Sequence, residues 1–401
     1  MSDPTDLSKH NTPHPFTRIP HELAHATVLG AGAWGTALAS ALQRSGVATT
    51  LWTRRADQAA QINVTHHTDA LHGTALPPAL RATQDLHAAT RATPLIIFAV
   101  PASATRELAR QLTGTLGSGT LVLSASKGFE RETGAFMTQV LDEALGRDIL
   151  SGVITGPSFA GEVARGEPTL LTLAMAALNP AHPRHGLARR QADALARVLA
   201  QVAIRVETTA DVIGAQVGGA LKNQIAIACG MAMGLGLGEN ARAGILTRGL
   251  DDMCRLTLAL GGRADTLLGS CGVGDLFLTA SSQQSRNTRL GMRLGAGECT
   301  SDMKPDALAE GAISAQTVAV LERALDIRLD LAATVRAVLA GVRTPAQALA
   351  DLLEPKCPLR TLPRPHANPT AQIALRTRLR PAEPDTHSAT PMPTPREQRH
   401  A

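Results

Sequence analysis

The chain has 401 residues, of which 44% are hydrophobic, so it can bury a core large enough for two domains. Its five cysteines are odd in number and show no CxxC spacing, which argues against a disulfide framework and favours a reduced, cytoplasmic protein. The net charge of +5 gathers in residues 355–401, a tail rich in proline and arginine and without aromatic residues, so we expect disorder there and no nucleic-acid partner.

Residues 1–25 are polar and lack the apolar run of a secretory signal, so we expect a disordered N-terminal tail. Within it, His21-Glu22-Leu23-Ala24-His25 matches the H-E-x-x-H zinc-protease pattern, which requires both histidines on one helical face. Pro20 precedes the match, and Ala26–Leu29, directly after it, is typical of a β-strand. Since this leaves no room for a metal-binding helix, we predict that the match is accidental and that the chain holds no metal.

A strand, a glycine-rich turn and a helix follow in the order that a dinucleotide-binding fold requires. Ala26–Leu29 leads into Gly30-Ala-Gly-Ala-Trp-Gly35, and residues 36–43 read as a helix. Gly30 permits the tight turn, Gly32 lets the backbone approach a pyrophosphate, and Gly35 allows the helix to pack closely on the strand. The anion would then lie at the N-terminus of the helix. We therefore predict a dinucleotide site here.

The residues after the second strand, expected at 48–52, indicate which dinucleotide binds. An acidic residue at this place holds the ribose hydroxyls of NAD, whereas an arginine accommodates the 2′-phosphate of NADP. The chain has Arg54 and Arg55 here and no carboxylate before Asp57. This favours NADPH over NADH, with two ordinary surface arginines as the alternative.

Strand and helix patterns then alternate to about residue 207, which predicts a Rossmann-like, doubly wound, mostly parallel sheet over residues 26–207. Ligands of such sheets collect at the carboxyl ends of the strands. Lys127 follows one expected strand and could reach an anion in the crevice, although a surface lysine is the alternative. Ser158 follows another, in a turn that does not match the G-x-S-x-G nucleophile elbow, so we expect it to contact a ligand without acting as a nucleophile.

From residue 208 to 354 helical patterns dominate, which predicts an all-helical second domain. Its first helix, expected over Asp211–Gly234, has Lys222 as its one charged residue between Val212 and Gly238. Lys222 lies on a stripe of glycine and alanine at i, i+4 spacing, which would let another element approach the ammonium closely. A lysine that extends to solvent is the simpler alternative, and the polar residues around it argue against a membrane span.

Two further segments of this half carry polar side chains in what we expect to be loops. Gly272–Asp275 supplies a carboxylate, and Ser285–Arg289 supplies an arginine and an asparagine. Such groups suit an oriented, partly anionic substrate.

At this point the chain resembles the NAD(P)-dependent glycerol-3-phosphate dehydrogenases, especially the bacterial type. Eight motifs occur in the family's order between about Ala26 and Val342. They are 30–39 (GAGAWGTALA), 126–130 (SKGFE), 156–160 (GPSFA), 219–223 (GALKN), 236–242 (GLGENAR), 247–250 (TRGL), 272–276 (GVGDL) and 285–287 (SRN).

The resemblance implies reversible reduction of dihydroxyacetone phosphate to sn-glycerol 3-phosphate with NADP or NAD, feeding glycerophospholipid synthesis, in a chain that could form a homodimer. It implies that Lys222 transfers the proton, with Lys127 and Asp275 beside it. Further substrate contacts would be Gly156, Ser158, Asn223, Ser285, Arg286 and Asn287. Besides the three glycines of the turn, the cofactor would contact Ala33, Trp34, Arg54, Arg55, Lys127, Ala160, Arg286, Leu308 and Glu310.

The chain departs from the family pattern at Trp34, where tyrosine or phenylalanine is common, and at Phe129, where an aliphatic residue is usual. Two alternatives stay open at this point. One is a related reductase that acts on another hydroxy or keto acid, and the other is a dinucleotide sensor without turnover.

Overall fold

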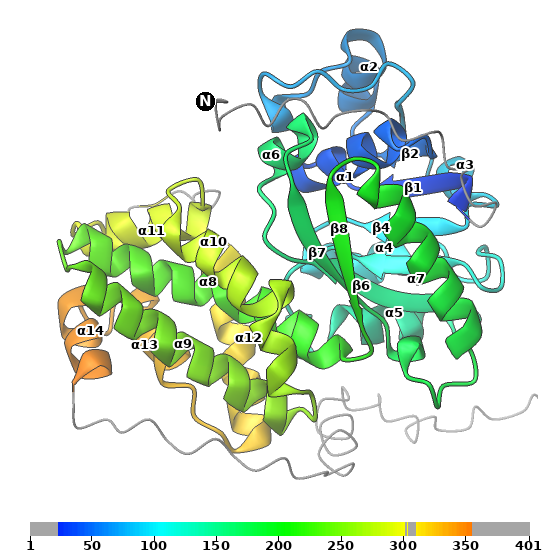
Figure 1. Ribbon diagram of the computed structural model, residues 1–401. Helices are drawn as coiled ribbons and strands as arrows, with labels where there is room; N and C mark the ends of the chain where they lie inside the picture. The colour runs from blue at the N-terminus through cyan, green and yellow to red at the C-terminus, as the bar shows by residue number, and fades with distance from the viewer. Residues whose placement is uncertain (1–22, 301–302, 304–309, 355–401) are drawn as a thin grey trace, which may run out of the picture.

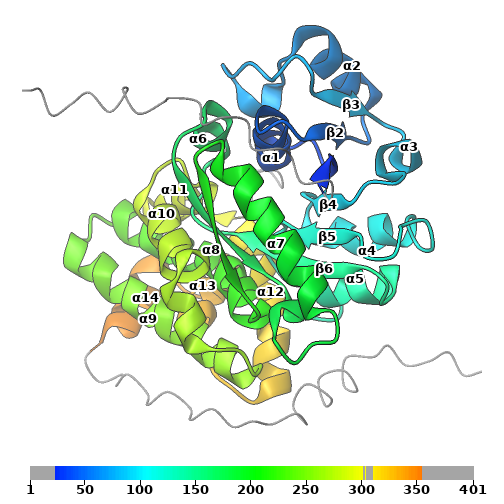
Figure 2. The ribbon, with the colours of Figure 1, turned by 45° about the vertical axis from the view of Figure 1, so that its right-hand side comes forward.

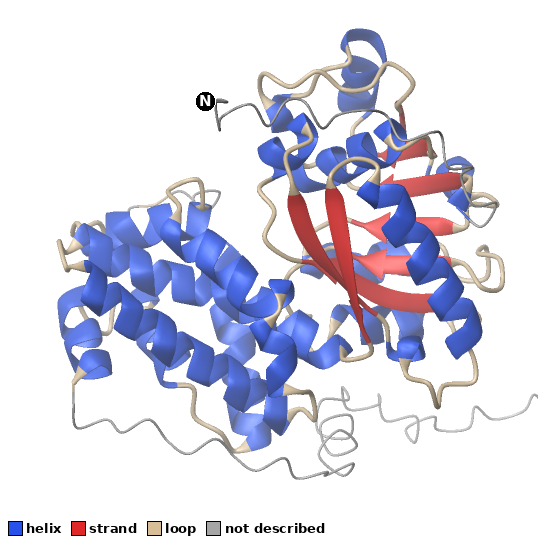
Figure 3. Cartoon of the chain, viewed as in Figure 1, coloured by secondary structure: helices blue, strands red, loops and turns tan. Residues whose placement is uncertain are grey.

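The computed structural model describes residues 23–300, 303 and 310–354. Two parts lie side by side (Figures 1 and 3): an eight-stranded sheet with helices on both faces, here called the sheet half, and a bundle of helices, here called the helical half. Residues 1–22 of the N-terminal tail predicted at 1–25, and the whole tail predicted at 355–401, lie outside the described residues. Leu23, which we had expected in the N-terminal tail, is fully buried, and β1 begins at His25.

The sheet confirms the predicted doubly wound, mostly parallel fold. Its strand order is β3-β2-β1-β4-β5-β6-β7-β8, and every neighbouring pair is parallel except β6 and β7. The strands are β1 His25–Leu29, β2 Ala48–Trp52, β3 Arg81–Thr83, β4 Leu95–Phe98, β5 Leu121–Ser124, β6 Leu150–Thr155, β7 Thr169–Ala174 and β8 Ile204–Thr209. Because β7 and β8 run antiparallel to the other strands, the C-terminus of β8 lies at the same end of the sheet as the N-terminus of β6.

Alternation along the strands divides the core of the sheet half into two layers. Val28 and Ile97 pack in one cluster with α1 and α7, whereas Leu29 and Phe98 pack in another with α4 and α5. Figure 2 shows α7 on one side of the strands and α4 and α5 on the other. The helices of this half are α1 Ala33–Arg44, α2 Ala56–Thr65, α3 Leu86–Thr90, α4 Ala102–Arg110, α5 Met137–Leu145, α6 Ala160–Arg165 and α7 His185–Ala200. The sequence pattern had not predicted α2, β3, α3 or α6.

Helix α8, Val212–Gly234, is the central element of the helical half and is buried from Gly214 to Ala232. Within the described residues it contacts all six other helices of that half, and it also lies beside β6 and β7. The remaining helices are α9 Glu239–Ala259, α10 Asp275–Ser281, α11 Arg286–Gly295, α12 Glu310–Leu325, α13 Asp330–Leu339 and α14 Pro345–Leu353.

The small-residue stripe of α8 has the close neighbours that its composition predicted. A Cβ added at Gly230 would lie 2.1 Å from the carbonyl oxygen of Thr288, and one at Gly291 would lie 2.0 Å from that of Ile227. Helices α8 and α11 therefore touch backbone to backbone. Nearer the start of α8, a Cβ added at Gly218 would lie 2.3 Å from the Cys271 carbonyl oxygen.

Candidate active site

Three charged side chains from distant parts of the chain meet at the end of the sheet where β5 and β6 terminate. The Lys222 ammonium on α8 donates to Oδ1 of Asp275, the first residue of α10. The Lys127 ammonium, on the loop after β5, donates to the other carboxylate oxygen, Oδ2, at 2.9 Å. Asp275 thus bridges the two lysines, and one of the two ion pairs joins the sheet half to the helical half.

This cluster is shielded from water. Asp275 is fully buried and Lys222 is 4% exposed, so the predicted alternative of a lysine extended to solvent is wrong. Burial lowers the pKa of Lys222 to about 7; the Asp275 charge opposes this shift and the Lys127 charge adds to it. For Asp275, burial favours the neutral acid, but the two ammonium groups outweigh it and hold the pKa below its usual value. Lys222 can therefore release and regain a proton near neutral pH beside a carboxylate that stays ionised.

Thr279 is a member of this cluster that the sequence had not indicated. Its hydroxyl donates to the carbonyl of Asp275, one helical turn earlier, and accepts from the Lys222 ammonium at 2.9 Å. A threonine inside a helix often bonds back to the i−4 carbonyl in this way, so no sequence signal distinguished it. Together, Thr279 and Asp275 fix the direction of the Lys222 side chain.

Two segments predicted as loops are in fact helix starts. Residues 270–274 form a π-helical turn that leads directly into α10, and Ser285 is the N-cap of α11, accepting from the Thr288 amide. The glycines in the first segment suggested a loop, but Gly272 serves close packing, since a Cβ there would lie 2.0 Å from the Leu267 carbonyl oxygen. Asp275 is consequently held by regular structure.

Arg286 and Asn287 occupy the first turn of α11 with different exposure. Arg286 is exposed, whereas Asn287 is buried and donates to Oδ1 of Asn223 on α8. The Asn287 side-chain oxygen accepts from the Gly311 amide in the first turn of α12. Asn223 and Asn287, two of the predicted substrate residues, therefore tie α8, α11 and the start of α12 together at the position next to Lys222.

The predicted turn after β6 closes the same end of the sheet. Gly156 has a φ of 145°, and a Cβ there would meet the Leu170 carbonyl oxygen at 2.8 Å, so only glycine fits. The Ser158 hydroxyl donates to the Gly156 carbonyl, and Ala160 begins α6. Nearby, Gly219 of α8 faces this region, since a Cβ there would lie 3.3 Å from Thr155 Oγ1 and 3.7 Å from Lys127 Cγ.

The glycine turn after β1 has the shape expected of a pyrophosphate site. Gly30 has a φ of 115° and no space for a side chain, and Gly35 packs against the Gly30 carbonyl. Gly32, in contrast, has no neighbour within 4 Å of where a Cβ would lie, so its backbone can be approached. It is the N-cap of α1, whose first two residues are Ala33 and Trp34. These features fit a dinucleotide phosphate at the helix N-terminus.

The two arginines after β2 differ. Arg55 forms a two-point ion pair with Asp57, with nitrogen–oxygen distances of 2.6 and 3.2 Å. Arg54 is exposed and has no ion pair within the described ranges. Of the two, Arg54 is therefore better able to bind an added phosphate. Leu308 lies outside the described residues, and Glu310 is the first residue of α12 but its side chain is not described.

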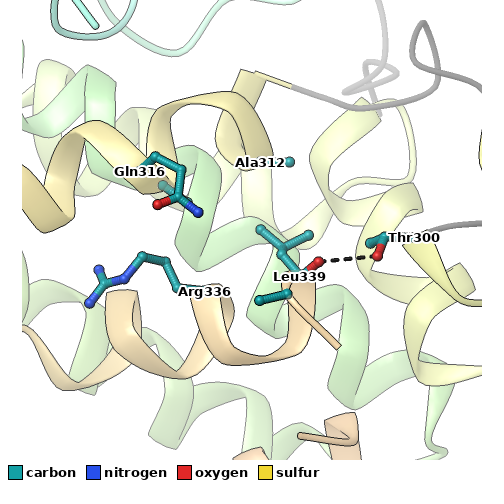
Figure 4. Close-up of a pocket in the computed structure, with 7 residues that line it drawn as sticks. Thr300, Ala312, Gln316, Arg336 and Leu339 are labelled. Atoms are coloured by element: carbon teal, nitrogen blue, oxygen red, sulfur yellow. Dashed lines mark hydrogen bonds between the residues drawn. The ribbon is translucent and has the colours of Figure 1, made fainter. Parts of the chain in front are cut away.

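A hollow lies elsewhere, between α12 and α13 (Figure 4). It is lined by Thr300, Ala312, Ala315, Gln316, Arg336, Leu339 and Ala340, and within it the Thr300 hydroxyl donates to the Leu339 carbonyl. It contains none of the predicted site residues. Among the residues that the structure describes, no three histidine, cysteine or acidic side chains are grouped as metal ligands. None of the described helices is long and apolar enough to cross a membrane.

Comparison with known proteins gives a consistent result. A family model described as the N-terminus of NAD-dependent glycerol-3-phosphate dehydrogenase matches residues 25–181, and one for the C-terminus matches residues 211–350. A relative from Stenotrophomonas maltophilia, named glycerol-3-phosphate dehydrogenase, NAD(P)+, is 42% identical over 329 residues, which cover 81% of this chain and 93% of the relative. One of the same name from Rhodospirillum rubrum is 41% identical over 358 residues, covering 87% and 98%.

Solved structures agree with these sequence matches. The crystal structure of glycerol-3-phosphate dehydrogenase from Coxiella burnetii has a TM-score of 0.75 at 34% identity and covers 82% of this chain and 98% of that one. A D-mandelate dehydrogenase with NADH has a TM-score of 0.52 at 12% identity, which shows a shared fold alone.

Proposed function

The chain belongs to the NAD-dependent glycerol-3-phosphate dehydrogenase family, and from that premise we propose that Lys222, Asp275 and Lys127 carry the proton transfer of its reaction. The enzyme is an oxidoreductase that interconverts dihydroxyacetone phosphate and sn-glycerol 3-phosphate with NADH or NADPH. The observation that most supports the proposed roles is the buried Lys222 ammonium, held by Asp275 and Thr279 at the end of the sheet where dinucleotides bind.

When bound, the nicotinamide cofactor would supply the hydride for the carbonyl carbon of the substrate. As charge develops on the carbonyl oxygen, the Lys222 ammonium stabilises it and donates a proton; in the reverse direction the neutral amine accepts the proton from the alcohol. A pKa of about 7 lets Lys222 serve in both directions at neutral pH. Asp275 holds the ammonium in place and balances its charge, and Lys127 supplies a second positive charge beside it.

For the phosphate we propose Arg286, with Ser285 and Asn287 beside it at the start of α11. An exposed guanidinium can bind a phosphate through two parallel hydrogen bonds, and the helix N-terminus favours an anion. The buried link from Asn287 to Asn223 fixes this end of α11 relative to α8, which supports a constant distance between the phosphate and Lys222.

For the cofactor we propose NADPH over NADH, with Arg54 on the 2′-phosphate. We further propose that the enzyme works in the cytoplasm as a homodimer. The described cysteines are all free, which suits a reducing compartment, and sedimentation equilibrium would give the oligomeric state.

The function is tested by following the absorbance of NADPH, and separately of NADH, during incubation with dihydroxyacetone phosphate, dihydroxyacetone and a series of 2-keto acids. Oxidation that requires the phosphorylated ketone supports the proposal. Oxidation with a keto acid but not with dihydroxyacetone phosphate would establish a different reductase, and cofactor binding without any oxidation would point to a sensor. In Arg286→Ala, the preference for the phosphorylated over the unphosphorylated ketone should fall; an unchanged ratio would remove Arg286 from the phosphate site.

A further inference from the structure

The segment that carries Lys127 is held at several points along its length. We call residues 126–136, between β5 and α5, the lysine loop. At its start the Ser126 hydroxyl donates to the carbonyl of Val100, two residues after the end of β4, at 2.5 Å. Further along, the rings of Phe129 and Phe136 pack 5.4 Å apart, and their backbones form an isolated bridge that closes residues 129–136. Lys127 therefore lies between two fixed points, Ser126, which is tied to the sheet half, and Phe129, whose ring packs in the hydrophobic cluster around α8.

A buried ion pair anchors the middle of the lysine loop. The carboxylate of Glu130, which is 6% exposed, accepts from Arg106 Nε at 2.6 Å and from Arg106 Nη2 at 2.8 Å. It also accepts from the Thr133 hydroxyl at 2.5 Å, within the loop itself. Arg106 lies on α4, so this two-point contact fixes both the position and the orientation of the loop relative to the helix layer behind the sheet.

The surroundings of Glu130 keep it ionised. Burial favours its neutral form, but Arg106, Thr133 and the more distant charge of Arg110 outweigh this and lower its pKa. The same Arg106 guanidinium also binds Glu143 on α5, whose side chain is 57% exposed. One arginine thus has two acidic partners, one inside the lysine loop and one on the surface.

A buried ion pair is weak evidence for stability, because the cost of removing both charges from water offsets most of their attraction. Its two-point geometry is instead well suited to fixing a position. Glu130 is three residues from Lys127, and Lys127 is the residue through which the sheet half contacts Asp275 of the helical half. A displacement of the lysine loop would therefore move the Lys127 ammonium relative to Asp275.

We propose that Glu130 and Arg106 are positioning residues that hold the Lys127 ammonium against Asp275, and through it set the charge environment of Lys222. This rests on the proposed function, in which Lys222 exchanges the proton. Among the described residues, the charged groups that face Lys222 are Asp275 and Lys127, so displacement of Lys127 removes the like charge that these residues place beside it. Lys222 would then hold its proton to higher pH.

The test compares Glu130→Gln with Glu143→Gln, which removes the other acidic partner of Arg106 and leaves the lysine loop intact. In Glu130→Gln we expect kcat/KM for dihydroxyacetone phosphate to fall roughly tenfold or more, since an error of about 1 Å in a reacting group can cost about a hundredfold. The pH at which the reduction rate declines should move upward, and the Kd for NADPH should stay within about threefold. Glu143→Gln should match the parent in all three measurements.

A second readout does not depend on turnover. The rate at which acetic anhydride labels Lys127, followed by mass spectrometry without substrate, should rise severalfold in Glu130→Gln because the loop no longer holds the ammonium on Asp275. If the parent failed to reduce dihydroxyacetone phosphate, the proposed function would fail, while the labelling comparison would still decide the positioning role.

The inference is overturned if Glu130→Gln labels Lys127 at the parent rate, or if its pH profile coincides with that of Glu143→Gln. A loss of thermal stability with unchanged profile and labelling would also overturn it, because the pair would then be structural only. Should Glu130→Gln fail to fold, Thr133→Val, which removes one hydrogen bond to the same carboxylate, is expected to shift the labelling rate and the pH profile in the same direction but less.

Discussion

Replacement of Lys222 by methionine separates its chemical role from its structural one. Methionine has a similar length and volume but cannot exchange a proton. Asp275 keeps the Lys127 ammonium at 2.9 Å, so the change leaves no buried charge unpaired. We therefore expect the free energy of unfolding to change by less than about 1.5 kcal/mol, as for volume-conserving core substitutions, and not by the 3–5 kcal/mol typical when a buried charge loses its partner.

The effect on turnover should be far larger. Loss of a positioned acid–base group costs roughly 100- to 10,000-fold in rate, and the Kd for NADPH should stay within a few-fold. The assay is NADPH oxidation with saturating dihydroxyacetone phosphate, together with fluorescence titration of the cofactor and thermal unfolding. Turnover within severalfold of the parent would refute the assignment of Lys222 as the proton donor.

The pH dependence gives an independent test of the same residue. Reduction needs the ammonium form of Lys222, so the parent rate should decline as pH rises through about 7. The residual activity of Lys222→Met should not show this decline. The free energy of unfolding should also depend on pH. Because the folded-state pKa lies below the ordinary value of 10.5, the unfolded chain binds the extra proton between these values, so this lysine makes the parent more stable as pH rises across that window. A parent and variant whose stability difference did not change with pH would contradict the shifted pKa.

Three further predictions concern other parts of the structure. Asp275→Asn leaves the buried Lys222 ammonium without its counter-charge and should lower the free energy of unfolding by roughly 3–5 kcal/mol in chemical denaturation; a loss below 1 kcal/mol would argue against a buried, ionised carboxylate. Gly230→Ala places a Cβ 2.1 Å from a carbonyl oxygen of α11 and should lower the free energy of unfolding by roughly 1–3 kcal/mol. Gly186→Ala, at an exposed position of α7, should leave that free energy unchanged or raise it slightly. Equal effects of the two substitutions would contradict the tight contact between α8 and α11. Arg54→Ala should raise KM for NADPH about tenfold or more and leave KM for NADH nearly unchanged; a parallel change in both would exclude Arg54 from the 2′-phosphate site.

The parts of the fold that were predicted from the sequence are those whose burial or turn geometry determines the residue types of a short segment. Leu95–Phe98 is apolar throughout because both faces of β4 are covered, and residues 30–35 combine glycines with a strand and a helix in a known order. Arg81–Thr83, by contrast, is a three-residue edge strand with one buried side chain, which is too short for any period to appear. The short helix α6 was missed for the same reason.

The candidate site was only partly accessible from the sequence. Lys222 was conspicuous as a lone charge in an apolar, glycine-rich helix, but its partner Asp275 is 53 residues away, and no local pattern joins them. The resemblance to a family brought the two together. Neither approach indicated Thr279 or the tie between Glu130 and Arg106, because a threonine in a helix and an arginine on a surface helix look ordinary until the tertiary contacts are known.

Because the last two strands are reversed, the number of α8 residues before Lys222 determines where its ammonium lies. The C-terminus of β8 lies at the end of the sheet where β6 begins. Helix α8 must therefore run along β6 before any of its residues reaches the opposite end, where β5 and β6 terminate and Lys127 lies. Ala215 packs beside Val153 and Gly219 lies beside Thr155, so the helix advances in step with the strand. Lys222 lies ten residues into α8, which is about 15 Å at 1.5 Å per residue. Insertion or deletion of a single residue before it would move the ammonium by about 1.5 Å and turn it by about 100°, so the length of this segment, as well as its composition, is under constraint.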